Sequence, residues 1–423
     1  MKPNILYVTC HDLGRHLGCY GDATIRSPNL DALAGEGVRF TRFFGASTPC
    51  SPARGCLITG RWAHATGLMG LAHIGWDLND GVRTIAHDLA DAGYHTRLVG
   101  FQHESPDPGK LGYHAVWRES VASDAVADEA TRFLRSPDAR RRPFFLSVGV
   151  AEVHLPFDRP QYDFADPAEV ALPAFLPDNE PTRKQMAMFH GAIGFMDRHL
   201  GHLLAALDDG PLADSTIVVF TTDHGMAFPR AKSTLYDPGI GTTAIVRLPE
   251  AMGARRGVCN DLVSGVDLRP TLCDLAGLPT PPDADGRSFA AVLTGDGQYA
   301  PRGEIFSEKN YHNHFDPCRC VRTRRYKYIR NCRDAPYCLL PSDIDEAFPA
   351  FSRRRDLDAP RPAEELYDLS ADPWENANLI DDPAHGAAAA DLRARLQRWM
   401  ADTDDPILRD PFIPYPPEQF APR

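Results

Sequence analysis

Four apolar segments, each followed by polar side chains, constrain the fold of this 423-residue chain most strongly. They read "NILYVT", "HTRLVG", "PFFLSVGV" and "STIVVFTT" and contain little polar alternation, which is typical of parallel strands buried on both faces. Helix-like segments such as "SPNLDALAGEG" and "KQMAMFHGAIGFMDRHLGHLLAALDD" separate them. This alternation predicts an α/β fold with a large mixed, mainly parallel sheet sandwiched by helices.

The pattern changes near residue 300. The segment "CVRTRRYKYIRN" alternates like an exposed antiparallel strand, and "AAAADLRARLQRWMADT" is amphipathic with a helical period. Between them, "PSDIDEAFPAFSRRRDLDAPRPAEE" predicts a long loop or insertion, and the proline-rich tail is expected to wrap the surface. We therefore predict a large domain over residues 1–300 and a small C-terminal α+β domain over residues 301–423.

The composition of the chain limits the kinds of molecule that it is expected to bind. The formal net charge of −12 argues against a nucleic-acid partner, and the absence of any apolar run of spanning length predicts no membrane segment. The start "MKPNILYVTC" enters a strand without an apolar leader, which predicts a cytoplasmic protein, although a leader removed before Met1 would leave the same sequence. The sequence does not define an oligomeric state.

The chain contains ten cysteines. In a chain of this length without a leader, they are expected to be reduced thiols rather than a disulfide framework. Cys318, Cys320, Cys332 and Cys338 have the composition of a zinc site, but their spacing fits one poorly.

Asp or His side chains follow every one of the four apolar segments. In open α/β sheets, ligands bind outside the carboxyl ends of the strands, so these side chains are expected to converge on one crevice. The side chains concerned are His11, Asp12, His103, Glu152, His154, Asp223 and His224.

Part of this set has the composition of a divalent-cation site. Asp12, Asp223 and His224 are the clearest candidates, and His11 is a less certain one. Carboxylate oxygens suit calcium, magnesium or manganese, whereas imidazoles shift the preference toward manganese, iron or zinc. The residue types alone leave the identity of the ion open.

Cys50 lies in the segment "TPCSPARGCLITGR", where a loop of small residues meets a helix-like run with Pro52 near its start. The N-terminus of a helix presents unpaired N–H groups and the positive end of the helix dipole, which favour an anion. Arg54 can add a planar, permanently charged fork. An inert core cysteine would not need these neighbours, so we predict an anion-handling site around Cys50.

The run from Cys50 to Arg54, followed by Leu57, Thr59 and Gly60, resembles the signature of the type I sulfatases in the alkaline phosphatase superfamily. The resemblance covers nearly the whole chain, including "TTDHGMAFPRAKSTLYDPGI" and "EELYDLSADPWENANL". Within the family, "GLAHIGWDLND" and "FPRAKSTLYD" are most similar to the heparan N-sulfatase (sulfamidase) branch and its bacterial relatives.

The resemblance implies that a formylglycine-generating enzyme converts Cys50 to Cα-formylglycine, the nucleophile. One hydroxyl of the hydrated aldehyde attacks sulfur, and loss of the proton from the other later expels sulfate. Arg54 would hold this hydrate, and His103, His154 and Lys232 would bind sulfate and move protons. The implied metal ligands are His11, Asp12, Cys50, Asp223 and His224, with calcium favoured and manganese or zinc as alternatives.

The expected activity is hydrolysis of a sulfate ester or sulfamate on a small sulfated substrate, expected to be a sugar. Two departures from the family pattern keep alternatives open: His11 stands where an aspartate is usual, and Phe101 where a lysine is usual. His11 and His224 favour a phosphonate monoester or phosphodiester hydrolase on the same scaffold. Phe101 favours an inactive, glycan-binding homologue.

Several further residues are weaker candidates. Glu152, Glu308, His312 and His314 are predicted to contact substrate, and His73 to line the pocket. A basic run is instead predicted to form a solvated strand face; it consists of Arg324, Arg325, Lys327 and Arg330.

Overall fold

The computed structural model describes residues 2–336, 339–349 and 359–413. An eight-stranded sheet dominates it, in the order β10-β2-β9-β7-β1-β6-β4-β5. These strands are β1 (Asn4–Cys10), β2 (Val38–Phe40), β4 (His95–Gly100), β5 (Ala115–Trp117), β6 (Phe144–Gly149), β7 (Thr216–Thr222), β9 (Ala244–Arg247) and β10 (Gly257–Cys259). The four apolar segments are therefore the contiguous strands β7, β1, β6 and β4, as the sequence predicts.

The central strands are parallel and share one polarity. Tyr7 pairs with Ser147 on β6 and with Val219 on β7, and Leu98 on β4 pairs with Ser147. Every residue of β1, β6 and β7 is buried, which explains the unbroken apolar runs. Only β9 opposes its neighbours β7 and β2, so the sheet is mixed but mainly parallel.

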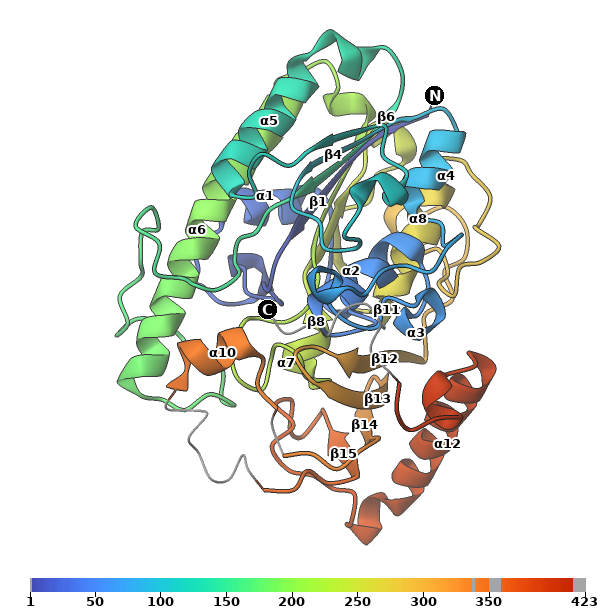
Figure 1. The fold of residues 1–423 in the computed structure, drawn as a ribbon. Helices are drawn as coiled ribbons and strands as arrows, with labels where there is room; N and C mark the ends of the chain where they lie inside the picture. The colour runs from blue at the N-terminus through green and yellow to red at the C-terminus, as the bar shows by residue number, and fades with distance from the viewer. Residues whose placement is uncertain (1, 337–338, 350–358, 414–423) are drawn as a thin grey trace.

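Helices cover both faces of the sheet (Figure 1). On one face lie α1 (Pro28–Glu36), α5 (Ser123–Arg135) and α6 (Glu180–Asp208), and on the other lie α2 (Cys50–Thr59), α4 (Ile85–Asp91) and α8 (Leu268–Leu275). The short helices α3 (Ala63–Thr66), α7 (Asp237–Ile240) and α9 (Ala290–Thr294) complete the large body. The α/β sandwich expected from the sequence is confirmed.

The two helices predicted on the first face form with small differences at their ends. Pro28 occupies the first turn of α1 and Gly37 follows its last residue, but Ser27 makes no capping bond and instead donates to Asp31 Oδ1. Helix α6 begins earlier than the apolar period suggests, because Asn179 Oδ1 accepts the backbone N–H of Thr182 and caps the helix.

The C-terminal region forms a separate four-stranded antiparallel sheet, followed by α12 (Gly386–Asp402). Its strands are β12 (Glu304–Tyr311), β13 (Phe315–Thr323), β14 (Tyr326–Asn331) and β15 (Glu364–Asp368). A three-stranded sheet joins β3 (Phe43–Phe44), β8 (Gly241–Thr242) and β11 (Val263–Ser264) between the two bodies. The boundary at residue 300 stays a prediction.

Two expectations for this region are wrong. The segment "CVRTRRYKYIRN" is a hairpin of two strands that are mostly buried, rather than an exposed strand, because α12 and the large body cover its two faces. The predicted long loop contains a helix, α10 (Ser342–Ala347), which lies against α6 in Figure 1. The remainder of that loop at 350–358, and the end of the proline-rich tail at 414–423, lie outside the described residues.

The nine cysteines in the described part of the chain form no disulfide. Cys338, one of the four weighed for zinc, lies outside the described residues. No helix within the described ranges combines the length and apolarity needed to cross a membrane.

Candidate functional site

The carboxyl ends of β1 and β7 bring four of the predicted metal ligands together. His11 Nδ1 lies 2.6 Å from Asp12 Oδ1 and 3.4 Å from Asp223 Oδ2. His224 Nε2 lies 3.2 Å from Asp12 Oδ1. Because β1 and β7 are parallel neighbours in register, the residues that follow them must share one edge of the sheet.

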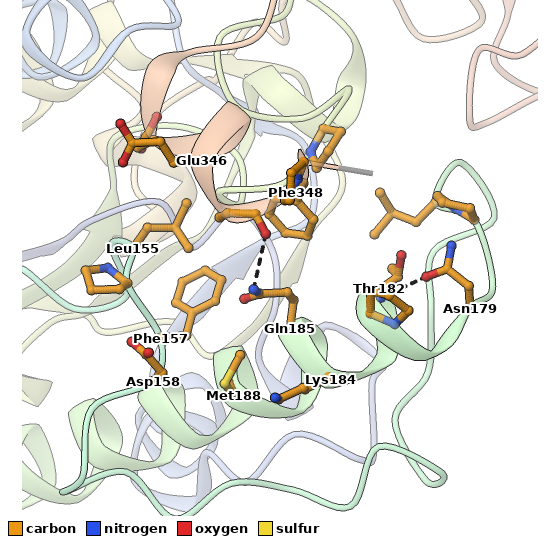
Figure 2. A pocket seen from close by; sticks show the side chains of 18 of the residues that line it. Leu155, Phe157, Asp158, Asn179, Thr182, Lys184, Gln185, Met188, Glu346 and Phe348 are labelled. Atoms are coloured by element: carbon orange, nitrogen blue, oxygen red, sulfur yellow. Dashed lines mark hydrogen bonds between the residues drawn. The ribbon is translucent and has the colours of Figure 1, made fainter. Parts of the chain in front are cut away.

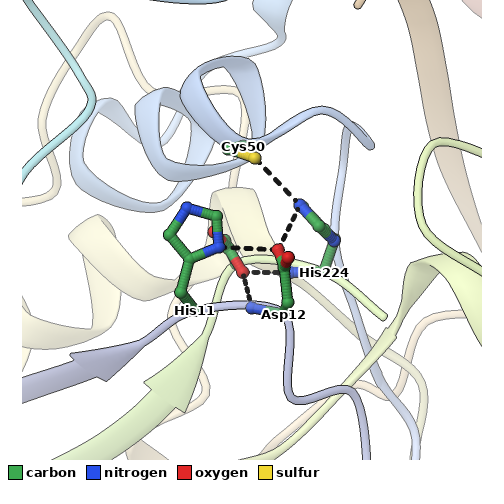
Figure 3. Close-up of side chains that lie close together, drawn as sticks. His11, Asp12, Cys50 and His224 are labelled. Carbon is green, nitrogen blue, oxygen red and sulfur yellow. Dashed lines mark hydrogen bonds and ion pairs between the residues drawn. The ribbon is translucent and has the colours of Figure 1, made fainter. Parts of the chain in front are cut away.

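Cys50 completes this group from the opposite side (Figure 3). It is the first residue of α2, and its Sγ lies 3.2 Å from His224 Nε2. Pro49 precedes the helix in an extended conformation, and Pro52 lies in the first turn, where it forfeits no helical hydrogen bond. The thiol is buried, which raises its pKa well above the ordinary value.

Arg54 lies one turn further along α2 and joins the helix to the strand ends. Its Nε donates to Asp223 Oδ2 over 3.1 Å, its Nη1 to Thr9 Oγ1 over 3.2 Å and its Nη2 to the Cys10 carbonyl over 2.7 Å. Each of the three guanidinium nitrogens thus makes one bond within the strand ends. Arg54 holds a metal-ligand candidate in place, whereas its predicted contact with the formylglycine hydrate stays a prediction.

Lys232 lies in the loop after β7 and reaches Asp12, one of the two carboxylates at the strand ends. Its Nζ lies 2.7 Å from Asp12 Oδ2 and 3.1 Å from His154 Nε2. A third partner was not predicted: Asp343 on α10, whose Oδ2 lies 2.6 Å from Lys232 Nζ and 3.5 Å from His154 Nε2. The loop after β6 supplies His154 and the end of β1 supplies Asp12, so four separate segments meet here.

His103 follows β4 and is hydrogen-bonded to His73, which the sequence predicted to line the pocket. His103 Nε2 lies 2.8 Å from His73 Nδ1. Burial lowers the pKa of His103 to about 2, so the imidazole is neutral, the state that a proton acceptor requires. His103 Nδ1 is buried without a hydrogen-bond partner among the described residues.

Burial alone would raise the pKa of both aspartates, but their neighbours reverse this effect. His11 and Lys232 hold the pKa of Asp12 well below its usual range, and His11, His224 and Arg54 do the same for Asp223. Burial would lower the pKa of Lys232, yet the Asp12 carboxylate raises it. Burial lowers the pKa of His11 to about 4. Two carboxylates are therefore ionised side by side.

The donor set fits a divalent cation. His11, Asp12, Cys50, Asp223 and His224 each offer one ligand atom, and all five atoms lie within 4.8 Å of one another in the interior. A second group with the same property consists of Asp12, His154 and Asp343. Two ionised carboxylates with two imidazoles can bind calcium, manganese or zinc, and this set of ligands does not distinguish among these ions.

Two of the predicted substrate residues, Glu152 and Glu308, are hydrogen-bonded in the interior, and their contact with substrate stays a prediction. Glu152 is 2% exposed, and its carboxylate accepts from the backbone and hydroxyl of Ser123 and from the hydroxyl of Tyr162. Glu308 is fully buried and accepts from both the backbone N–H and Nδ1 of His64. Neither carboxylate can reach a substrate without breaking these bonds.

The other two proposed substrate residues stay predictions. His312 is buried near Lys232, and burial together with that lysine lowers its pKa to about 3. His314 is exposed, and its carbonyl accepts from the backbone of His312. The basic run is not uniformly solvated: Lys327 is fully buried, with its Nζ 2.6 Å from Asp237 Oδ1.

Known proteins resemble this chain in sequence and in fold. The sulfatase family model matches residues 3–278, and that of the N-sulphoglucosamine sulphohydrolase C-terminal region matches residues 224–342. The N-sulphoglucosamine sulphohydrolase of Homo sapiens is 30% identical over 464 residues, covering 95% of this chain and 91% of the human protein.

Two solved structures share the fold. A phosphonate monoester hydrolase of Agrobacterium radiobacter superposes with a TM-score of 0.76 at 21% identity, covering 95% of this chain and 96% of that one. A protein solved in complex with its substrate D-glucosamine-2-N,6-O-disulfate gives a TM-score of 0.76 at 20% identity, covering 97% and 99%.

Fold, site and sequence relatives together define a hydrolase of sulfuric esters or sulfamates. The chain belongs to the sulfatase family, since that family's model spans more than half of it.

Proposed function

We propose that this protein hydrolyses the sulfate ester or sulfamate of a small sulfated sugar, with Cys50 as the precursor of its nucleophile. The position of Cys50 carries the proposal. Its Sγ faces the ligand group from the first turn of α2, 3.2 Å from His224 Nε2. The helix N-terminus favours the anionic sulfate beside it.

The nucleophile is proposed to be the hydrated aldehyde formed from Cys50 by a formylglycine-generating enzyme. One of its hydroxyls, having lost its proton to solvent, forms the bond to sulfur through its oxygen as the bond from sulfur to the leaving oxygen or nitrogen breaks. The second hydroxyl then gives up its proton, the aldehyde reforms and sulfate departs. A water molecule adds to the aldehyde and restores the hydrate, so each turnover consumes one water. His103, held neutral by burial, is the proposed acceptor of that proton.

The leaving group needs a proton, and His154 is its proposed donor. His154 is about one-third exposed in its side chain, and its Nε2 lies 3.1 Å from Lys232 Nζ. Its Nδ1 lies 2.7 Å from the Leu155 carbonyl, which orients the ring. The Lys232 ammonium would balance the negative charge on the sulfate oxygens.

His11, Asp12, Asp223 and His224 would hold the divalent cation, with calcium favoured and manganese or zinc as alternatives. A cation bound there supplies Lewis-acid polarisation of the sulfate oxygens and lowers the pKa of a hydroxyl. Asp12 and Asp223 are kept ionised, and Arg54 fixes the orientation of Asp223 through a 3.1 Å bond.

The sugar substrate is inferred from relatives. The human relative is named for N-sulphoglucosamine, and one structural relative was solved with a disulfated glucosamine as its substrate. The phosphonate monoester hydrolase on the same fold makes phosphonate esters the second candidate, because a tetrahedral anion suits the same group of ligands.

The test is mass spectrometry across Cys50 in protein produced with a formylglycine-generating enzyme, followed by assays on glucosamine N-sulfate, 4-nitrophenyl sulfate and phenylphosphonate esters with calcium or manganese. We expect the aldehyde, hydrolysis of the sulfated compounds, and a rate loss of at least about 1,000-fold in Cys50→Ala. Chelation should abolish turnover, and the added cation should raise the midpoint of thermal unfolding. An unconverted Cys50 under conditions that convert a control sulfatase would refute the proposal.

A further inference from the structure

A cleft of about 970 Å³ lies between the loop after β6, the first turns of α6 and helix α10 (Figure 2). This volume lies within the range of small-molecule sites. Its walls are mainly apolar and include Leu155, Phe157, Leu176, Met188, Ala347 and Phe348. None of the candidate site residues predicted from the sequence lines this cleft.

The polar side chains of the wall are partly engaged with neighbouring backbone. Gln185 Nε2 donates to the Ala347 carbonyl over 3.3 Å, and Asn179 Oδ1 accepts the Thr182 N–H. Figure 2 shows both bonds. The cleft therefore offers a ligand apolar contact more than hydrogen bonds.

Asp343 connects the cleft to the catalytic groups, because it lines the cleft and its Oδ2 also lies 3.5 Å from His154 Nε2. The same oxygen lies 2.6 Å from Lys232 Nζ. Leu155 also lines the cleft and directly follows His154 in the chain. One end of the cleft is thus bounded by a carboxylate that contacts the proposed proton donor.

The geometry of in-line attack at sulfur places the leaving group toward this end of the cleft. Cys50 approaches the ligand group beside His224, whereas His154 stands beside Lys232 and Asp343. In-line displacement places the leaving atom opposite the attacking atom. A leaving group that takes its proton from His154 is therefore expected on the side of Asp343 and α10, where the cleft lies.

We propose that this cleft binds the leaving group of the substrate, and that this leaving group presents an apolar face, such as an aryl ring or the apolar side of a substituted sugar. The inference rests on the proposed function, since it takes His154 as the proton donor. Burial of about 50 Å² of additional apolar surface would strengthen binding about tenfold.

Non-hydrolysable sulfonates test the cleft directly, because their C–S bond is not cleaved. We would titrate methanesulfonate, benzenesulfonate and naphthalene-2-sulfonate calorimetrically into the mature, cation-loaded protein. Affinity is expected to rise about tenfold or more from the first to the last. Ala347→Trp, which fills the cleft, should remove this gain and leave methanesulfonate binding unchanged. Met188→Ala should weaken naphthalene-2-sulfonate severalfold.

Val116→Trp is the matched control, because Val116 is 42% exposed on β5 at the edge of the sheet. Equal affinity for the three sulfonates, or an unchanged gain in Ala347→Trp, would overturn the inference. Hydrolysis of 4-nitrophenyl sulfate by the same preparations separates the two proposals. If the protein turns over 4-nitrophenyl sulfate but binds the three sulfonates with equal affinity, only the proposed role of the cleft is refuted. If affinity rises along the sulfonate series but no turnover is found, the proposed function is refuted, and so is the assignment of the bound apolar group as a leaving group.

Discussion

The guanidinium carbon of Arg54 lies 4.9 Å from the centre of the Phe101 ring. Phe101 stands where the family usually has a lysine, and here its ring contacts the guanidinium of Arg54, whose three nitrogens donate to oxygens at the strand ends. A lysine at this position would instead oppose a like charge in the interior. The aromatic residue is therefore compatible with an intact Arg54, which weakens the case for an inactive homologue.

Arg54→Lys is expected to lower kcat/KM at least about 100-fold. A lysine ammonium cannot replace three forked bonds to Asp223, Thr9 and the Cys10 carbonyl. Steady-state kinetics on 4-nitrophenyl sulfate measures the effect. Phe101→Leu is the comparison, because it keeps every Arg54 hydrogen bond and removes the ring contacts with Arg54, His11 and His103. The contact with Arg54 is worth about 0.5–2 kcal/mol, and the variant should keep most of the activity. Equal activity losses in both variants would contradict this account.

Asp343→Asn is expected to lower KM for a sulfated substrate severalfold. The Asp343 carboxylate shares the Lys232 ammonium at 2.6 Å, so an incoming sulfate must compete with it for that charge, and a neutral amide competes less. The matched control is Asp345→Asn, an exposed carboxylate on the same helix. A KM that rises in Asp343→Asn would show that the carboxylate binds the substrate instead.

The sequence predicted those parts of the molecule that depend on local pattern. Buried parallel strands produce continuous apolar runs, and chain direction places the residues after β1 and β7 at one edge, so Asp12 and Asp223 could be grouped from the sequence alone. The start of α2 could be placed because Pro52 and Cys50 mark it.

Residues whose role depends on a distant partner could not be predicted. Glu152 and Glu308 look like solvated carboxylates until Tyr162 and His64 are seen to bind them. Asp343 belongs to no motif, and it reaches the site only because α10 lies against α6. An acidic residue inside the predicted long loop was the available signal, and it is a weak one.

His64 predicts a specific dependence of stability on pH. Its Nδ1 lies 2.9 Å from Glu308 Oε1 and its Nε2 3.2 Å from the Thr403 carbonyl. Both partners are acceptors, so both ring nitrogens must carry protons. Burial alone would lower the pKa of His64, but the Glu308 carboxylate raises it above its usual value.

This contribution to stability is complete below the unfolded-state pKa of about 6.5 and is lost as pH rises through the higher folded-state pKa. The free energy of unfolding, measured in urea titrations, should therefore fall as pH rises above about 6.5. His64→Gln should cost about 1–3 kcal/mol at pH 6 and flatten this slope. His202→Gln, at an exposed position on α6, should leave the slope unchanged. A slope that survives in His64→Gln would assign it to other groups.

Gly149 at the end of β6 links packing of the sheet to the site. A Cβ on Gly149 would lie 1.9 Å from the Phe101 carbonyl oxygen, while the Phe101 N–H donates to the Gly149 carbonyl over 2.7 Å. Gly149→Ala must therefore push the end of β4 away, at a cost of about 1–3 kcal/mol or more, and displace Phe101 from Arg54. We expect a lower thermal midpoint together with lower kcat.

Gly35→Ala is the opposite control, because no atom lies within 4 Å of its Cβ position in α1 and alanine there should stabilise the helix by up to about 1 kcal/mol. Calorimetry on the two variants measures both thermal midpoints. If the midpoint of Gly149→Ala equals or exceeds that of the unmodified chain, the ends of β4 and β6 can move apart without cost. The positions of Phe101 and Arg54 would then not depend on this contact.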